Sequence, residues 1–179
     1  EGFLADTAVR WEAAADAARE AGIRVVHARF GLIISRKGGL LARIRLPFQT
    51  ALGGKLGTGR QWWPWISLPD VIKGLVYLIG NEDISGPVNF TAPTPVRNEE
   101  LTKLMAKTLS RPAWFNIPAA IIRLIFGEMG EETMLSSQRV FPGKLSASGF
   151  KWSFESIEDV LHQELIASRS DRWGSTSRG

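Results

Sequence analysis

The chain has 179 residues, 44% of them hydrophobic and 22% charged, which suits one globular domain, or one domain with a small appendage, around a sizeable core. It has no cysteine and two histidines, which excludes disulfides, thiolate chemistry and cysteine-ligated metals and leaves little for a histidine-based site. The formal net charge is +4, but the basic residues are scattered without a run of five, so we predict no nucleic-acid partner. No apolar run approaches the roughly 20 residues of a membrane span, so we predict no membrane contact and a cytoplasmic location.

The first elements predict an α/β fold. Residues 3–21 are rich in alanine with apolar side chains at helical spacing, which indicates a helix whose smooth face lies close on a sheet. Gly22 is a natural end for this helix. Residues 23–28 are a β-branched run typical of a strand in a covered parallel sheet. A helix followed directly by such a strand is half of a crossover unit.

The residues after this strand are a candidate binding site. In open α/β sheets, ligands collect at the carboxyl ends of the strands, where the backbone around Gly31 would lie. A plain turn glycine explains Gly31 equally well. Residues 35–39 then read as a polar loop, and residues 40–52 as a short helix interrupted near Pro47.

A glycine-rich turn leads into an aromatic run. Four glycines between positions 53 and 59 precede Arg60, and three tryptophans follow at positions 62, 63 and 65. An arginine beside indole rings can bind an anion with its fork and stack on a ring. Alternatively, the rings pack beneath an irregular loop while Arg60 points into water. On the residues alone we slightly prefer packing, because large aromatic side chains mostly belong to protein cores.

A capped helix follows the tryptophans. Ser67 is the predicted cap, with an early proline and Asp70 as a helix-start acid, and the helix runs to about Gly80. Its apolar residues recur on one face: Ile72, Leu75, Val76 and Ile79.

The second half reads as a strand and several helices. We predict a strand at 87–91, a helix at 99–109 capped by Asn98, a short strand at 114–117, helices at 118–126, 131–139 and 156–167, and a disordered polar tail at 168–179. Three acids crowd together at Glu128, Glu131 and Glu132, as acid–base catalysis would require. A solvated helix start explains them more simply, and we prefer it.

Several motifs, in order over residues 3–166, resemble a known family. They are WEAAA from Trp11, ARFGLIIS from Ala28, GTGRQWWPWI from Gly57, GPVNFTAPTPVRNEE from Gly86, LIFGEM from Leu124 and SSQRVFP from Ser136. The chain resembles the C-terminal portion of an atypical extended short-chain dehydrogenase/reductase, of the NAD(P)-dependent epimerase/dehydratase type and the SulA-like nucleoside-diphosphate-sugar epimerase branch.

This resemblance implies a partial Rossmann-like sheet plus a small, mostly helical C-terminal domain. It places the C-terminal part of the Rossmann-like domain, with its substrate loop, at residues 1–95. The helical domain would follow at 96–167 and the tail at 168–179. The glycine fingerprint that holds the cofactor pyrophosphate in this family is absent from the sequence. NADP would therefore be bound through a full-length parent, and binding by this chain alone is doubtful.

The family's residues can be carried over position by position. The catalytic tyrosine and lysine of ordinary members fall at Leu4 and Ala8, neither of which can move a proton, so we predict no catalytic residue here. The resemblance implies cofactor contacts from Phe30, Gly31, Leu32 and Ile33, and substrate contacts from Arg60, Gln61, Trp63 and Trp65. Trp63 occupies the position where sugar-nucleotide epimerases often carry a diphosphate-binding arginine, so Arg60 would have to supply that charge.

Three functions follow as hypotheses. The first is the substrate-side half of an NAD(P)-binding epimerase/reductase-like protein that takes a small-molecule substrate. The second is a non-catalytic interaction or regulatory module that retains the fold. The third is single-stranded nucleic-acid binding through Arg60 and the tryptophans, which the scattered charges disfavour. In each case we expect this chain alone to leave a sheet edge exposed. The missing N-terminal half, a partner chain, or a second copy in a homodimer would cover that edge.

Overall fold

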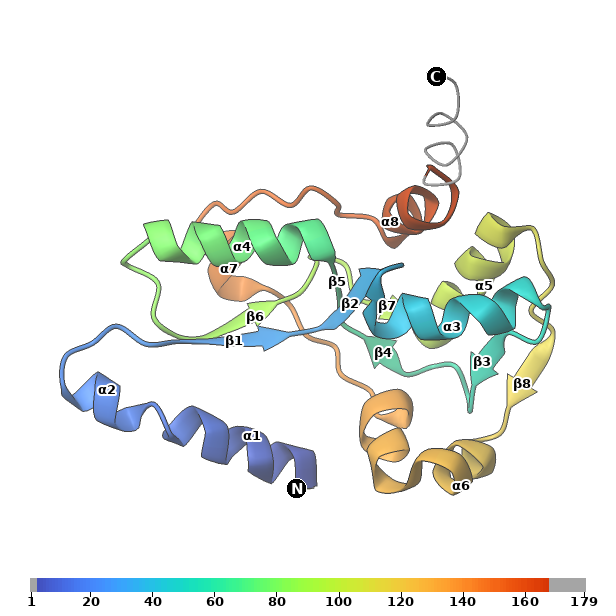
Figure 1. Ribbon diagram of the computed structural model, residues 1–179, viewed down its shortest axis with the longest axis horizontal. Coiled ribbons are helices and arrows are strands. Elements are labelled where there is room, and N and C mark those ends of the chain that lie inside the picture. The colour runs from blue at the N-terminus through green and yellow to red at the C-terminus, as the bar shows by residue number, and fades with distance from the viewer. Residues whose placement is uncertain (1–2, 168–179) are drawn as a thin grey trace, which may run out of the picture.

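A computed structural model describes residues 3–167, which form a mixed α/β fold (Figure 1). The helices are α1 (Phe3–Ala13), α2 (Asp16–Glu20), α3 (Gly39–Gln49), α4 (Leu68–Gly80), α5 (Asn98–Leu109), α6 (Ala119–Gly130), α7 (Gly143–Ala147) and α8 (Ile157–His162), with π-helical turns η1 (Glu131–Leu135) and η2 (Gln163–Ala167). The strands are β1 (Val26–Phe30), β2 (Leu32–Ser35), β3 (Gly54–Leu56), β4 (Trp62–Trp63), β5 (Trp65–Ser67), β6 (Gly86–Phe90), β7 (Val96–Arg97) and β8 (Phe115–Ile117). The predicted tail at 168–179 lies outside the described residues.

The strands pair across long stretches of sequence. β1 pairs with β6, β2 with β5 and β3 with β8, all in parallel, whereas β4 and β7 are antiparallel. The first two pairs meet where the Ala92 amide donates to the Trp65 carbonyl at 2.6 Å. The predicted parallel strand after the first helix is therefore confirmed, at Val26–Phe30.

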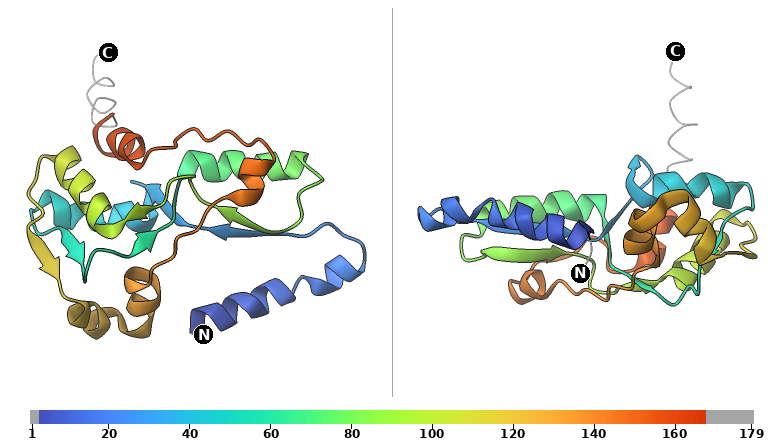
Figure 2. Two further views of the ribbon diagram at one scale, coloured as in Figure 1. Left: turned by 180° about the vertical axis from the view of Figure 1, so that it is seen from behind. Right: turned by 90° about the horizontal axis from the view of Figure 1, so that it is seen from below.

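Two buried clusters form the core. One gathers side chains of β2, α3, β5, α5 and α8, including Trp63 and Trp65. The other lies around β6, with α4 and α7 on opposite sides of that strand (Figure 2), and includes Val88 and Phe90. Within the described residues, no helix has both the length and the apolarity that crossing a bilayer requires, and no group of acidic or histidine side chains is arranged to hold a metal.

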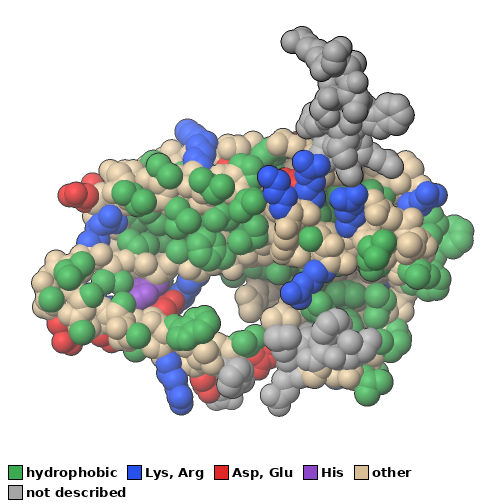
Figure 3. Space-filling model, viewed as in Figure 1, with side chains coloured by type: hydrophobic (Ala, Val, Ile, Leu, Met, Phe, Trp, Pro, Cys, Tyr) green, Lys and Arg blue, Asp and Glu red, His purple; other side chains and the backbone are tan. Residues whose placement is uncertain are grey.

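The first helix differs from the prediction. It breaks at residues 14–15 into α1 and α2, and none of their described side chains is buried. Instead of lying close on a sheet, α1 stands apart from β1, with an opening between them (Figure 3). A side-chain ion pair connects α1 to β1: the Arg29 guanidinium donates to both oxygens of Glu12 at 2.6 Å. That bond lowers the pKa of Glu12, so the attraction is present at neutral pH and is lost as the pH falls through that lowered value.

The predicted start of α4 is confirmed, but its apolar stripe faces outward. The Ser67 hydroxyl accepts from the Asp70 amide at 3.1 Å, as an N-cap does. The four stripe residues, Ile72 to Ile79, are 40% to 76% exposed, while Val71, Gly74 and Leu78 face the core. Helical spacing identifies apolar faces on a helix. It does not show which face packs against the core when, as in α4, two faces are apolar.

Other boundaries changed for local reasons. α3 continues through Pro47 to Gln49. Asn98 is inside α5, whose N-cap is Arg97, because the Asn98 side chain instead accepts from the Leu56 amide at 2.8 Å. The helix expected at 131–139 is the short η1, and residues 136–142 are irregular.

Candidate pocket at the carboxyl end of the parallel strands

Gly31 joins β1 to β2 at a point where two chain segments nearly touch. Its amide donates to the Phe90 carbonyl at 3.0 Å, and the Leu32 amide donates to the Pro64 carbonyl at 2.8 Å. A Cβ atom on Gly31 would lie 2.8 Å from that Pro64 oxygen, closer than side chains pack. Gly31 is thus required for the close approach of the β1 end to the segment that carries the tryptophans.

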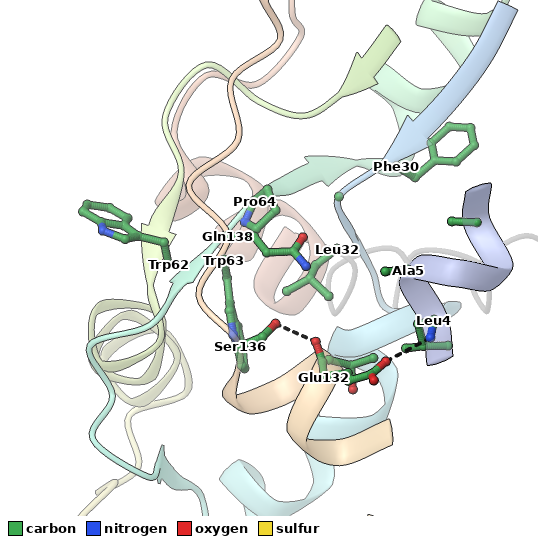
Figure 4. Close-up of a pocket in the computed structure, with 13 residues that line it drawn as sticks. Leu4, Ala5, Phe30, Leu32, Trp62, Trp63, Pro64, Glu132, Ser136 and Gln138 are labelled. Carbon is green, nitrogen blue, oxygen red and sulfur yellow. Dashed lines mark hydrogen bonds between the residues drawn. The ribbon is translucent and has the colours of Figure 1, made fainter. Parts of the chain in front are cut away.

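A pocket of about 500 Å³ opens beside this junction (Figure 4). Four segments supply its wall: the start of α1, the β1–β2 junction, the residues from β4 to Pro64, and the segment from η1 to Gln138. The lining residues are Leu4, Ala5, Ala8, Phe30, Gly31, Leu32, Trp62, Trp63, Pro64, Glu132, Thr133, Ser136 and Gln138. Most of the wall is apolar, and Glu132 is the single ionisable group in this lining.

The positions aligned with the family's tyrosine and lysine lie in this wall. Leu4 and Ala8 are one turn apart on α1, so both reach the same pocket. On the alignment implied by the resemblance, an aliphatic side chain and a methyl group would replace the phenol and the amine in this wall.

Glu132 is the polar exception: it lies in the first turn of η1, as the predicted acidic helix start requires, but it also has a contact that the prediction did not include. Its Oε2 accepts from the Leu4 amide at 3.1 Å, across 128 positions of sequence, and it lines the pocket. Glu131 is an exposed ion-pair partner instead: the Arg123 guanidinium donates to it at 2.7 Å and lowers the pKa of its carboxyl. The Glu128 side chain lies outside the described residues.

The structure brings together three of the four expected cofactor-binding residues. Phe30, Gly31 and Leu32 line the pocket. Ile33 does not; it pairs with Ile66 in the sheet and packs against the second core cluster. The cofactor role of these residues stays a prediction.

Of the expected substrate-binding residues, Trp63 alone lines the pocket. It is 4% exposed, and its buried Nε1 has no hydrogen-bond partner among the described residues. Trp65 is 1% exposed, and its Nε1 donates to the Thr94 carbonyl at 2.7 Å. Gln61 is also buried and donates to the carbonyls of Leu56 and Met134, while Arg60 is exposed. The structure does not bring Arg60, Gln61 or Trp65 to this pocket.

The lining also contains residues to which the sequence assigned no binding role. Ser136 and Gln138 belong to the SSQRVFP motif, which supported the family resemblance, but the motif has no spacing of its own that indicates a site. Only the fold shows that this segment returns to the carboxyl end of β1.

Comparisons with known proteins agree with this architecture. Residues 117–164 match the family model of a domain of unknown function, DUF1731. Over 160 residues, 89% of the chain, the sequence is 41% identical to an epimerase family protein of Mycobacterium bovis and covers 53% of it. Over 165 residues, 92% of the chain, it is 39% identical to an epimerase family protein of Staphylococcus aureus and covers 54% of it. The chain thus spans about half the length of the curated relatives it matches.

Solved structures give the same result. Human epimerase family protein SDR39U1, crystallised with NADPH, superposes with a TM-score of 0.76 at 30% identity, over 79% of this chain and 48% of that one. A nucleoside-diphosphate sugar epimerase from Corynebacterium glutamicum gives a TM-score of 0.74 at 30% identity, over 97% of this chain and 34% of that one. These matches confirm both the predicted partial Rossmann-like α/β fold and the resemblance to extended short-chain dehydrogenases/reductases of the epimerase type.

Proposed function

Since this chain is similar, over nearly its whole length, to part of epimerase family proteins, we propose that it forms the substrate-side half of an atypical NAD(P)-binding epimerase/reductase-like protein. The pocket beside Gly31 would receive the nicotinamide end of NADP and a small, nucleotide-linked molecule. Its position at the carboxyl end of parallel strands carries the proposal, because ligands of open α/β sheets bind there.

The pocket residues fit one end of such a cofactor. Its volume of about 500 Å³ lies within the ordinary range for small-molecule sites. Its apolar walls suit a planar ring. A bound nicotinamide would supply hydride transfer. Because this sequence contains no glycine fingerprint for the pyrophosphate, we expect NADP to bind this chain weakly.

A second function is favoured by one observation. The resemblance aligns Leu4 and Ala8, both in the pocket wall, with the tyrosine and lysine that ordinary members use for proton transfer. A non-catalytic interaction or regulatory module could retain the fold and the pocket. Such a module would not need the tyrosine and lysine. Hydride transfer from NADPH to a nucleotide sugar, measured by loss of nicotinamide absorbance, would exclude this alternative.

Blocking the pocket should abolish binding of a nicotinamide probe. Reduced nicotinamide mononucleotide carries the nicotinamide without the adenine half, and its binding can be followed by energy transfer from tryptophan. Ala8 is exposed yet lines the pocket, so Ala8→Phe fills the cavity without disturbing the core. We expect it to weaken binding at least about tenfold, a cost of roughly 1.4 kcal/mol.

The matched control is Ala17→Phe, which adds the same ring to an exposed position of α2 outside the pocket lining. It should bind the probe as the parent chain does. Equal weakening by both variants, or no energy transfer with the parent chain at millimolar probe, would contradict the proposed site.

We also propose that the outward face of α4 packs against a second copy of this chain. Its four apolar side chains make a continuous patch in Figure 3. The isolated chain should therefore self-associate, and Ile72→Lys with Ile79→Lys should shift it toward monomer in sedimentation velocity. A parent chain that stays monomeric at high micromolar concentration would contradict this.

A further inference from the structure

Trp62 has two arginine side chains over its ring. The guanidinium carbon of Arg97 lies 4.6 Å from the ring centroid and that of Arg139 lies 4.8 Å from it. The Trp62 ring points away from Leu32 and Gln138, on the other side of β4 from the pocket centre (Figure 4). Trp62 thus also lines the pocket, whereas Arg97 and Arg139 lie outside its lining.

Backbone pairing fixes the cluster from two sides. Trp62 is paired with Arg97 in the antiparallel β4–β7 ladder. From the opposite segment, the Gln138 amide donates to the Trp62 carbonyl at 3.0 Å, and the Trp62 amide donates to the Ser137 hydroxyl at 3.0 Å. These bonds place Arg139, the next residue, beside the same ring.

The two positive charges are held close together without a neutralising acid. The guanidinium carbons can be no farther apart than the sum of their distances to the ring centroid, 9.4 Å. In the part of the chain that the structure describes, neither guanidinium forms a salt bridge with a carboxylate. Two like charges within this distance repel each other, and an anion bound beside them would reduce that repulsion.

Stacking leaves the hydrogen-bonding edges of both arginines available. A guanidinium stacks through its face, while its five N–H donors lie in the plane and point outward. One donor of Arg97 is used by the Arg60 carbonyl at 3.3 Å. The remaining donors form forks of the kind that bind phosphate oxygens in pairs.

We propose that Arg97 and Arg139, oriented on Trp62, form a binding site for the phosphate or diphosphate group of a small molecule. A nucleic-acid strand is a poorer ligand, because the guanidinium groups already lie over the ring on which a base would stack. The site does not depend on nicotinamide binding in the pocket.

Calorimetry of the 179-residue chain with inorganic pyrophosphate at low ionic strength tests the proposal. Arg97→Gln and Arg139→Gln should each weaken binding by about tenfold or more, since each removes charge-assisted hydrogen bonds. The double variant should show no measurable heat. The control Arg43→Gln removes one positive charge from the exposed face of α3 and should leave the affinity unchanged.

Lysine variants, which retain the positive charge, distinguish a loss of phosphate recognition from a loss of folding. Arg97→Lys and Arg139→Lys retain the charge but lose the planar fork, so they should bind pyrophosphate with affinity between those of the parent and the glutamine variants. Each variant's fold is checked by circular dichroism.

Three results would overturn the proposal. They are absence of pyrophosphate binding to the parent chain, equal weakening by the Arg43 control, and binding of a single-stranded oligonucleotide but not pyrophosphate with the same dependence on Arg97 and Arg139. Pyrophosphate should also leave nicotinamide mononucleotide binding unchanged. Failure of one site thus leaves the test of the other intact.

Discussion

Replacing Asp70 by alanine should lower the free energy of unfolding by about 3–5 kcal/mol. The Asp70 carboxylate is fully buried, at 0% exposure, and accepts three hydrogen bonds, one from its own helix cap and two from a segment more than 80 positions away. The Ser67 hydroxyl donates at 2.7 Å, the Ser153 amide at 2.6 Å and the Phe154 amide at 3.1 Å. Alanine would leave both amides without an acceptor in a part-buried site, and each such loss costs about 1–3 kcal/mol.

Urea unfolding followed by circular dichroism measures this effect. Asp83→Ala is the matched control, because it removes the same charge from an exposed position. Asp70→Asn keeps the volume and one acceptor oxygen, so it should lie between the parent and Asp70→Ala. A midpoint for Asp70→Ala equal to that of the control would show that the three bonds contribute nothing.

Replacing Trp65 by alanine should also cost about 3–5 kcal/mol, the range for truncating a large buried aromatic residue. Trp65 packs in the first core cluster, and its indole N–H donates to the Thr94 carbonyl. Trp65→Phe retains a ring but leaves that carbonyl unpaired, so it should cost less than alanine. The exposed Trp11→Ala is the control for loss of an indole, with an expected change within about 0.5 kcal/mol.

The same variants separate the two interpretations of the aromatic run. If Trp65 contacts substrate, truncation should reduce ligand binding with little loss of stability. If Trp65 is a core residue, as its burial indicates, its truncation should lower stability to heat and urea even when no ligand is present. Unchanged unfolding of Trp65→Ala would contradict the core assignment.

Local features of the fold could be predicted because their causes are local. The Ser67 cap depends on a hydroxyl three residues before the Asp70 amide. The β-branched residues before His27 indicate a strand at the right place, although β1 begins only at Val26, so residues 23–25 of the predicted strand lie outside it. Asn98 shows the limit of this reasoning. Its side chain has the chemistry of a cap, but the Leu56 amide, 42 positions away, uses it instead.

The pocket could be predicted only in part. Gly31 was found because it follows a strand in an α/β pattern, and strand ends bind ligands. The sequence indicates Glu132 only as one of three neighbouring acids, because its contact with Leu4 spans 128 positions and leaves no trace in either local pattern. The tryptophans were grouped by sequence, although adjacent strand residues face opposite sides, which separates Trp62 from Trp63.

The parallel pairings described above have a consequence for how the chain reaches its fold. β1 at residue 26 must wait for β6 at residue 86, and β3 at residue 54 must wait for β8 at residue 115, before either ladder can form. Ordering such distant segments is entropically slow, so the unpaired strands spend a long time exposed during synthesis on the ribosome. The chain should thus depend on chaperones more than a helical protein of equal length does.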